Sequence, residues 1–130
     1  MAGFSSYEEI YAWQEGRELV RLVYSMIRDS AAVKDFGMKD QIQRAAVSVC
    51  SNIAEGFERR GNREFVSFLW IAKGSAAEVS SQLYHFKDLG YVSDEDFARL
   101  YEKTKVIRVS LYRLIKSISD SNPTLDYKRI

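Results

Sequence analysis

Basic side chains concentrate near the C-terminus of this 130-residue chain. Between residues 99 and 116 a single acid, Glu102, accompanies six basic residues that avoid the apolar stripe: Arg99, Lys103, Lys105, Arg108, Arg113 and Lys116. Such a face attracts polyanions and can bind the phosphates of RNA or DNA. It can equally be a solvated helix face, because three acids at residues 94–96 suit the positive start of the same helix.

Four arginines form a second candidate group for binding RNA or another anion: Arg44, Arg59, Arg60 and Arg63. The first of them begins a polar line at helical spacing that continues through Ser48, Ser51 and Glu55, with Asn52 on its flank. A hydrogen-bonded network in which each polar group finds a partner explains this line as well. Over the whole chain 19 Lys and Arg balance 18 Asp and Glu, which excludes a basic nucleic-acid tail but not a local basic face.

Residues suited to catalysis or metal binding are scarce. The single histidine, His85, has no Ser-His-Asp order around it, and the single cysteine, Cys50, has the setting of a small core residue. There is no phosphate-binding or dinucleotide glycine motif, no Cys-x-x-Cys and no Glu-x-x-His. We therefore expect no enzymatic activity, no cofactor and no metal. One cysteine and no long apolar stretch predict a cytoplasmic protein without membrane contact.

Apolar residues at spacings of three and four predict four helices, over residues 7–29, 37–59, 63–89 and 94–120, followed by a tail over 121–130. The expected boundary signals are a capping box of Ser6 with Glu9, an N-cap at Asn62, a left-handed C-cap at Gly90, and a cap at Ser93. Because the connections are short, neighbouring helices must be antiparallel. The sequence predicts one all-α domain over residues 1–130, an antiparallel up-down-up-down four-helix bundle.

Each predicted helix has one apolar face. On the first helix that face is expected to hold Trp13, Gly16, Val20, Val23, Tyr24 and Ile27. The third helix is unusual because it carries apolar residues on a second side as well: Val66, Trp70, Ala77 and Tyr84. Val109 and Tyr112 repeat the pattern more weakly on the fourth helix. A helix that is apolar on two sides is usually buried on two sides, which predicts a homo-oligomer interface; partial cover by neighbouring helices is the alternative.

Four stretches together resemble a known family. The most specific is QIQRAAVSVCSNIAEGFERR at residues 41–60; YAWQEGRELV at 11–20, FLWIAKGSAAEVSSQL at 68–83 and LGYVSDEDF at 89–97 accompany it. They resemble the four-helix-bundle proteins encoded in intervening sequences of bacterial 23S ribosomal RNA genes. That family commonly has a proline where this chain has Cys50, so its absence predicts a straighter second helix.

The resemblance implies a bundle that assembles into a ring, typically a homopentamer. A distant relative of the family, the accessory variability protein of diversity-generating retroelements, is similar in fold and binds a reverse transcriptase and nucleic acid. We therefore expect a non-enzymatic, ring-forming protein that binds RNA or DNA through its basic helix faces. The alternative is an oligomeric scaffold or accessory protein that binds a protein partner and has no direct affinity for nucleic acid.

Overall fold

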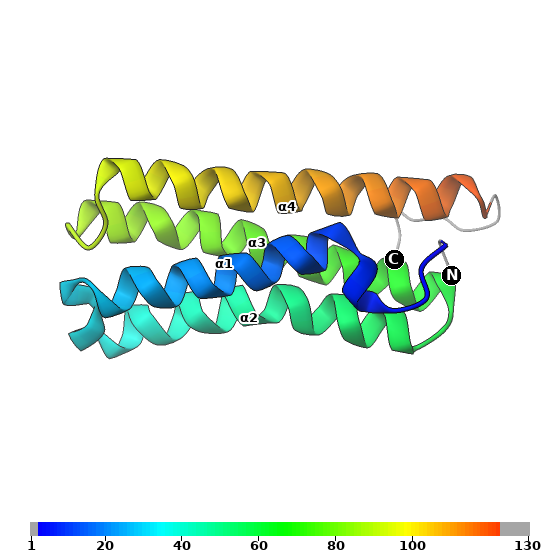
Figure 1. The fold of residues 1–130 in the computed structure, drawn as a ribbon, viewed down its shortest axis with the longest axis horizontal. Helices are drawn as coiled ribbons and strands as arrows, with labels where there is room; N and C mark the ends of the chain where they lie inside the picture. The colour runs from blue at the N-terminus through cyan, green and yellow to red at the C-terminus, as the bar shows by residue number, and fades with distance from the viewer. Residues whose placement is uncertain (1–2, 123–130) are drawn as a thin grey trace.

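Four long helices follow one another in the computed structural model, which describes residues 3–122: α1 (Tyr11–Arg28), α2 (Phe36–Glu58), α3 (Asn62–Asp88) and α4 (Asp94–Asp120). There are also two short 3-10 helices in this part of the chain. The first, η1 (Tyr7–Glu9), precedes α1, and the second, η2 (Ala31–Lys34), connects α1 to α2. Consecutive helices run in opposite directions and α1 packs against α4 to close the bundle (Figure 1). The predicted all-α, up-down-up-down four-helix bundle is confirmed. Of the predicted tail, residues 123–130 lie outside the described part.

The boundaries of α2 and α4 are set by side chains that cap free backbone N–H groups. Asp35 Oδ1 accepts a hydrogen bond from the Met38 N–H at 3.2 Å, and Ser93 Oγ accepts one from the Asp96 N–H at 3.1 Å. A carboxylate or hydroxyl in this position satisfies a donor that has no partner inside the helix. The predicted cap at Ser93 is confirmed; the cap at Asp35 is an addition.

The connection from α3 to α4 closes with a glycine in the left-handed region. Gly90 has a φ of +74°, its N–H donates to Lys87 O at 3.0 Å, and the next N–H, of Tyr91, donates to Phe86 O at 2.8 Å. These two bonds form a Schellman motif, which satisfies the last carbonyls of the helix and confirms the predicted C-cap. The Tyr91 hydroxyl donates to Asp35 Oδ2 at 2.8 Å, so this connection is tied to the start of α2.

The predicted capping box of the first helix and the predicted N-cap of the third are wrong. The first helix does not begin with a capping box at Ser6: residues 7–9 form the turn η1, the chain is extended at Ile10, and α1 begins at Tyr11. Ile10 is only 1% exposed, so burial of this side chain in the core favours the break in the helix. Asn62 is already helical, with Gly61 before it as N-cap; its side chain donates instead to Asn122 Oδ1 at 3.1 Å.

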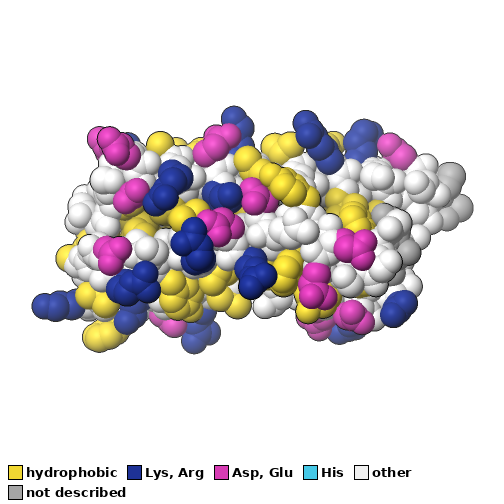
Figure 2. Space-filling model, in the orientation of Figure 1, with side chains coloured by type: hydrophobic (Ala, Val, Ile, Leu, Met, Phe, Trp, Pro, Cys, Tyr) yellow, Lys and Arg dark blue, Asp and Glu magenta, His cyan; other side chains and the backbone are white. Residues whose placement is uncertain are grey.

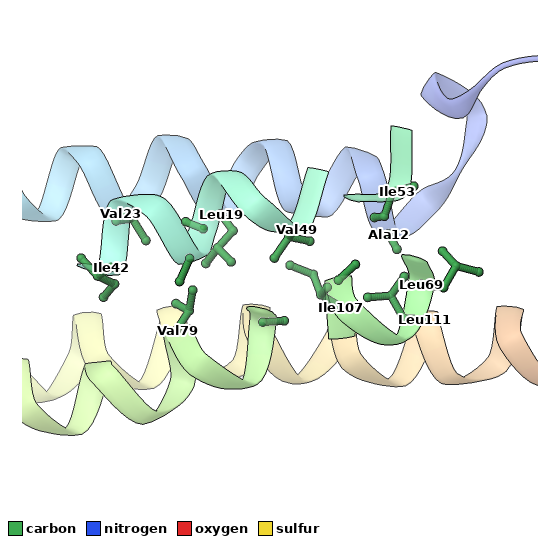
Figure 3. Close-up of a cluster of buried hydrophobic side chains, with 14 of the residues drawn as sticks. Ala12, Leu19, Val23, Ile42, Val49, Ile53, Leu69, Val79, Ile107 and Leu111 are labelled. Atoms are coloured by element: carbon green, nitrogen blue, oxygen red, sulfur yellow. The ribbon is translucent and has the colours of Figure 1, made fainter. Parts of the chain in front are cut away.

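Aliphatic side chains from all four helices meet along the bundle axis, as Figure 3 shows for Leu19, Val49, Leu69 and Ile107. The inner face of α1 differs from the prediction, because Tyr24 is 44% exposed whereas Ala12, Leu19 and Leu22 are buried. Gly16, Val23 and Ile27 are buried as predicted, so the true stripe overlaps the predicted one and is displaced from it by less than one residue position. Val66 is also buried completely, because α3 packs against both α2 and α4; it is therefore a core residue and not part of an external interface.

Two glycines let helices approach each other closely. A Cβ added at Gly16 would lie 2.9 Å from Cys50 Sγ, and one added at Gly56 would lie 2.5 Å from Phe68 Cβ. Both distances are well below van der Waals contact. Gly16 therefore fixes the rotation of α1 against α2, and Gly56 fixes the spacing of α2 and α3.

Candidate nucleic-acid interface

Five of the ten basic residues predicted to bind nucleic acid are held by carboxylates of the same chain. The ion pairs are Arg44–Asp40 at 2.8 Å, Arg59–Glu55 at 3.2 Å, Arg99–Asp96 at 3.2 Å, Lys103–Glu15 at 3.0 Å and Lys116–Asp120 at 3.8 Å. On the face drawn in Figure 2, basic and acidic side chains are interspersed in the same way. Each carboxylate offsets the charge of its partner, so these five residues add little to an anion-binding field.

The four arginines predicted as one cluster are not brought together. Arg44 precedes Arg59 by fifteen residues on a continuous helix, which is about 22 Å along the axis. Arg60 and Arg63 lie with Arg59 at the turn between α2 and α3, and the bond between Asn62 and Asn122 places the end of α4 beside that turn. The bundle therefore has no basic face on α2, and at the turn Arg59 is paired with both Glu55 and Glu64.

The polar line on α2 divides in two. Ser48 Oγ lies 2.8 Å from Ser75 Oγ on α3, and Asn52 Nδ2 donates to the Ser48 carbonyl at 2.8 Å. This part is a hydrogen-bonded contact between α2 and α3, which agrees with the alternative interpretation of the polar line as a hydrogen-bonded network. Arg44 and Glu55 instead make exposed ion pairs along the helix surface.

The remaining basic residues of α4 line a hollow of about 640 Å³ between α3 and α4. We call this hollow the basic groove and define it by Lys73, Tyr101, Lys105, Arg108, Val109, Tyr112 and Arg113. Four of its seven residues are cationic and none is acidic. Within residues 3–122 none of the four cations has a carboxylate within 4.0 Å, so their charges are not offset locally.

Aromatic rings hold two of the four cations in place. The guanidinium of Arg108 lies 5.8 Å from the centre of the Tyr101 ring, and its Nε–H donates to Thr104 O at 3.3 Å. The ammonium of Lys73 lies 5.6 Å from the centre of the Trp70 ring. Cation–π contacts of this kind orient a positive group without neutralising it. The groove therefore combines fixed positive charge with aromatic surface, which suits a ligand that has both phosphates and rings.

The residues predicted as an oligomer interface lie in four different settings. Tyr112 and Val109, which are 42% and 41% exposed, line the basic groove itself, and Trp70 packs edge-on against Tyr112 with ring centres 6.4 Å apart. Tyr84 is 50% exposed and belongs to an aromatic cluster with Phe97 and Tyr101. Ala77 is half-buried, and Val66 belongs to the core. The basic groove therefore contains both residues predicted to bind nucleic acid and residues predicted to join copies of the chain.

Lys73 and Tyr101 are the two basic-groove residues that were not predicted as site residues. Lys73 is the one basic residue in the middle of α3, three positions after Trp70, whereas the predicted basic residues lie on the second and fourth helices and at the turn between α2 and α3. The i, i+3 spacing of a cation and an aromatic ring is a readable sequence signal.

The residues considered for catalysis show no catalytic arrangement. His85 is exposed, and burial raises the pKa of the Cys50 thiol to about 11, because a thiolate is poorly solvated there. The Cys50 thiol donates a hydrogen bond to Trp13 O at 3.3 Å. In residues 3–122 no cluster of His, Cys, Asp and Glu could hold a metal ion. Over the same range no helix is both long and apolar enough to cross a bilayer.

The family model described as 23S rRNA-intervening sequence protein matches residues 8–113, which include α1, α2, α3, most of α4 and the whole basic groove. The chain belongs to this family. A solved member of the S23 ribosomal protein family, a Bacteroides thetaiotaomicron protein described as having unknown function, is similar in structure with a TM-score of 0.73. The two chains are 25% identical, and the match covers 81% of this chain and 95% of the other. No curated protein matches this member of the family.

Proposed function

We propose that this protein is a non-enzymatic, nucleic-acid-binding bundle of the 23S rRNA-intervening sequence family that acts as a homo-oligomer in the bacterial cytoplasm. It requires no cofactor. The resemblance to ring-forming relatives favours five copies. In such an assembly each copy contributes one basic groove, so that a modest positive patch is repeated around the particle and its field is strengthened.

The observation that carries the proposal is the set of uncompensated cations in the basic groove. Lys73, Lys105, Arg108 and Arg113 share one hollow without a carboxylate partner in the described chain, although the net charge is only +1. On the rest of α4, by contrast, Arg99, Lys103 and Lys116 each have a carboxylate within 4.0 Å. A cation kept free in a hollow can exchange its counterion for a phosphate, and the released counterion favours binding.

Salt-titrated binding tests the proposal. We expect labelled RNA or DNA to bind at low salt, and the affinity to fall steeply between about 50 and about 200 mM salt. The double variant Lys105→Glu/Arg113→Glu removes two phosphate contacts, so the slope of log K against log salt should flatten by about 2. A variant with the same change in net charge, Arg28→Glu/Lys34→Glu, alters exposed residues outside the groove and should keep the slope. Absence of binding at low salt, or binding that salt does not weaken, contradicts the proposal.

A protein-interaction scaffold is the second candidate, and the exposed rings on the face of α3 and α4 favour it. Tyr84 is 50% exposed, and Ile71, which the sequence analysis did not single out, is equally exposed. If this face joins copies, Tyr84→Asp should lower the mass per particle in light scattering. Tyr24→Asp on α1, where the ring is 44% exposed, is the matched control. A scaffold without the first function would assemble normally and bind no nucleic acid at any salt concentration.

A further inference from the structure

A ridge of α4 separates the basic groove from a second hollow. Lys105, Val109 and Arg113 follow one another at i, i+4 and i+8, so they lie in one line along the helix. These three residues line both the basic groove on the α3 side and a hollow of about 380 Å³ on the α1 side. The second hollow also contains Tyr11, Glu102, Val106 and Ser110.

Each hollow contains an exposed tyrosine ring beside the cationic ridge. Tyr112 in the basic groove is 42% exposed, and Tyr11 in the second hollow is 54% exposed. The Tyr11 hydroxyl donates to Glu15 Oε1 at 3.3 Å, which restrains the side chain while its ring remains accessible. An exposed ring in a concave site presents a surface on which a flat ligand can stack.

The several positive charges of the ridge suit a ligand with a row of phosphates better than a ligand with one negative charge. The side chains of Lys105 and Arg113 have no hydrogen-bond or ion-pair partner among residues 3–122, and Lys73 and Arg108 add two further cations on the groove side. Glu102 is the one acid in the two hollows. A carboxylate there can accept a hydrogen bond from an exocyclic amino group of a base.

From this arrangement, and resting on the proposed function above, we propose that the ridge binds an unpaired nucleic-acid strand. Its phosphates lie on Lys105 and Arg113, and its bases stack on Tyr112 on one side and Tyr11 on the other. A duplex cannot use these rings, because its base faces are already stacked inside the helix. An unpaired strand offers both its charge and its base faces, which is the combination used by proteins that bind single strands.

Three probes separate charge from stacking: a labelled oligothymidylate strand, an abasic strand with the same number of phosphates, and the same sequence as a duplex, which carries a second phosphate backbone. We expect the thymidylate strand to bind about 100-fold more tightly than the abasic strand, because the abasic strand lacks both stacking contacts, each of which contributes about tenfold. Tyr112→Ala or Tyr11→Ala should weaken thymidylate binding by about tenfold, and neither should change abasic binding. Tyr112→Phe keeps the ring and should bind normally. Tyr24→Ala removes an exposed tyrosine from another part of α1 and should have no effect.

Each other result overturns this inference in a distinct way. If the duplex and the abasic strand bind as tightly as the thymidylate strand, phosphates alone are recognised, and the proposed nucleic-acid function remains without the stacking site. If no probe binds at low salt, both proposals fail. If Tyr112→Ala lowers the mass per particle in light scattering, the groove is a contact between copies and not a strand-binding site.

Discussion

The close contact at Gly56 gives the most direct test of the fold. A Cβ at this position would lie 2.5 Å from Phe68 Cβ, 3.1 Å from Phe68 Cγ and 3.3 Å from Phe65 Cδ1. The nearest atom is attached to the backbone of α3, so no change of rotamer can move it away. In Gly56→Ala the two helices must separate by about 1 Å to restore normal contact.

The expected magnitude is a difference between two effects. Overpacking of a well-packed core costs roughly 1–3 kcal/mol, and a clash with a Cβ atom belongs at the upper end. Replacement of glycine by alanine within a helix returns about 1 kcal/mol. We therefore expect Gly56→Ala to lower the free energy of unfolding by about 2 kcal/mol, measured by urea denaturation at matched protein concentration.

Gly74 on α3 provides the matched control, because a Cβ added there has no atom within 4 Å. Gly74→Ala should retain only the gain in helix propensity and should raise the free energy of unfolding by about 1 kcal/mol. The two substitutions are chemically identical and both lie inside helices. If they shift stability in the same direction, the described packing of α2 against α3 is refuted.

Three further outcomes follow from local geometry. With its pKa raised to about 11 by burial, the Cys50 thiol should react with iodoacetamide at pH 8 about 100-fold more slowly in the folded protein than in urea; equal rates would contradict its burial. The hydrogen bond to Asp35 raises the pKa of Tyr91, so the folded state keeps this proton longer than the unfolded state. Stability supplied by that bond is therefore present below pH 10 and lost as the pH rises further, and Tyr91→Phe should flatten this part of the denaturation profile. Gly90→Ala forces a side chain into a φ of +74° and should cost about 1 kcal/mol in urea denaturation, whereas unchanged stability would contradict the left-handed cap.

Local signals explain why the helices and their connections were predictable. Ser93 and Gly90 act through bonds to residues only a few positions away, so their roles can be read from sequence. The rotation of α1 cannot be read in this way. Leu19 and Val20 are both apolar, and the packing of α1 against both α2 and α4 decides that Leu19 is fully buried while Val20 is only half-buried.

The candidate site was less predictable, because it depends on contacts between distant residues. Lys103 is paired with Glu15, 88 positions away in the chain, so its charge is offset in a way that no spacing within α4 reveals. Val66 has the position of a surface residue on α3 considered alone and becomes buried only when two helices pack beside it. The merging of Tyr112 with Lys73 in one groove likewise requires the packing of α3 against α4.

Asp35 holds two parts of the bundle with one carboxylate: Oδ1 caps α2, and Oδ2 accepts the hydroxyl of Tyr91 from the other connection at the same end. Those two connections are therefore thermodynamically coupled, although 56 positions separate the residues that join them. Opening of one connection removes the partner of the other. This end of the molecule should thus exchange its amide hydrogens as one cooperative unit and not as two independently fraying loops.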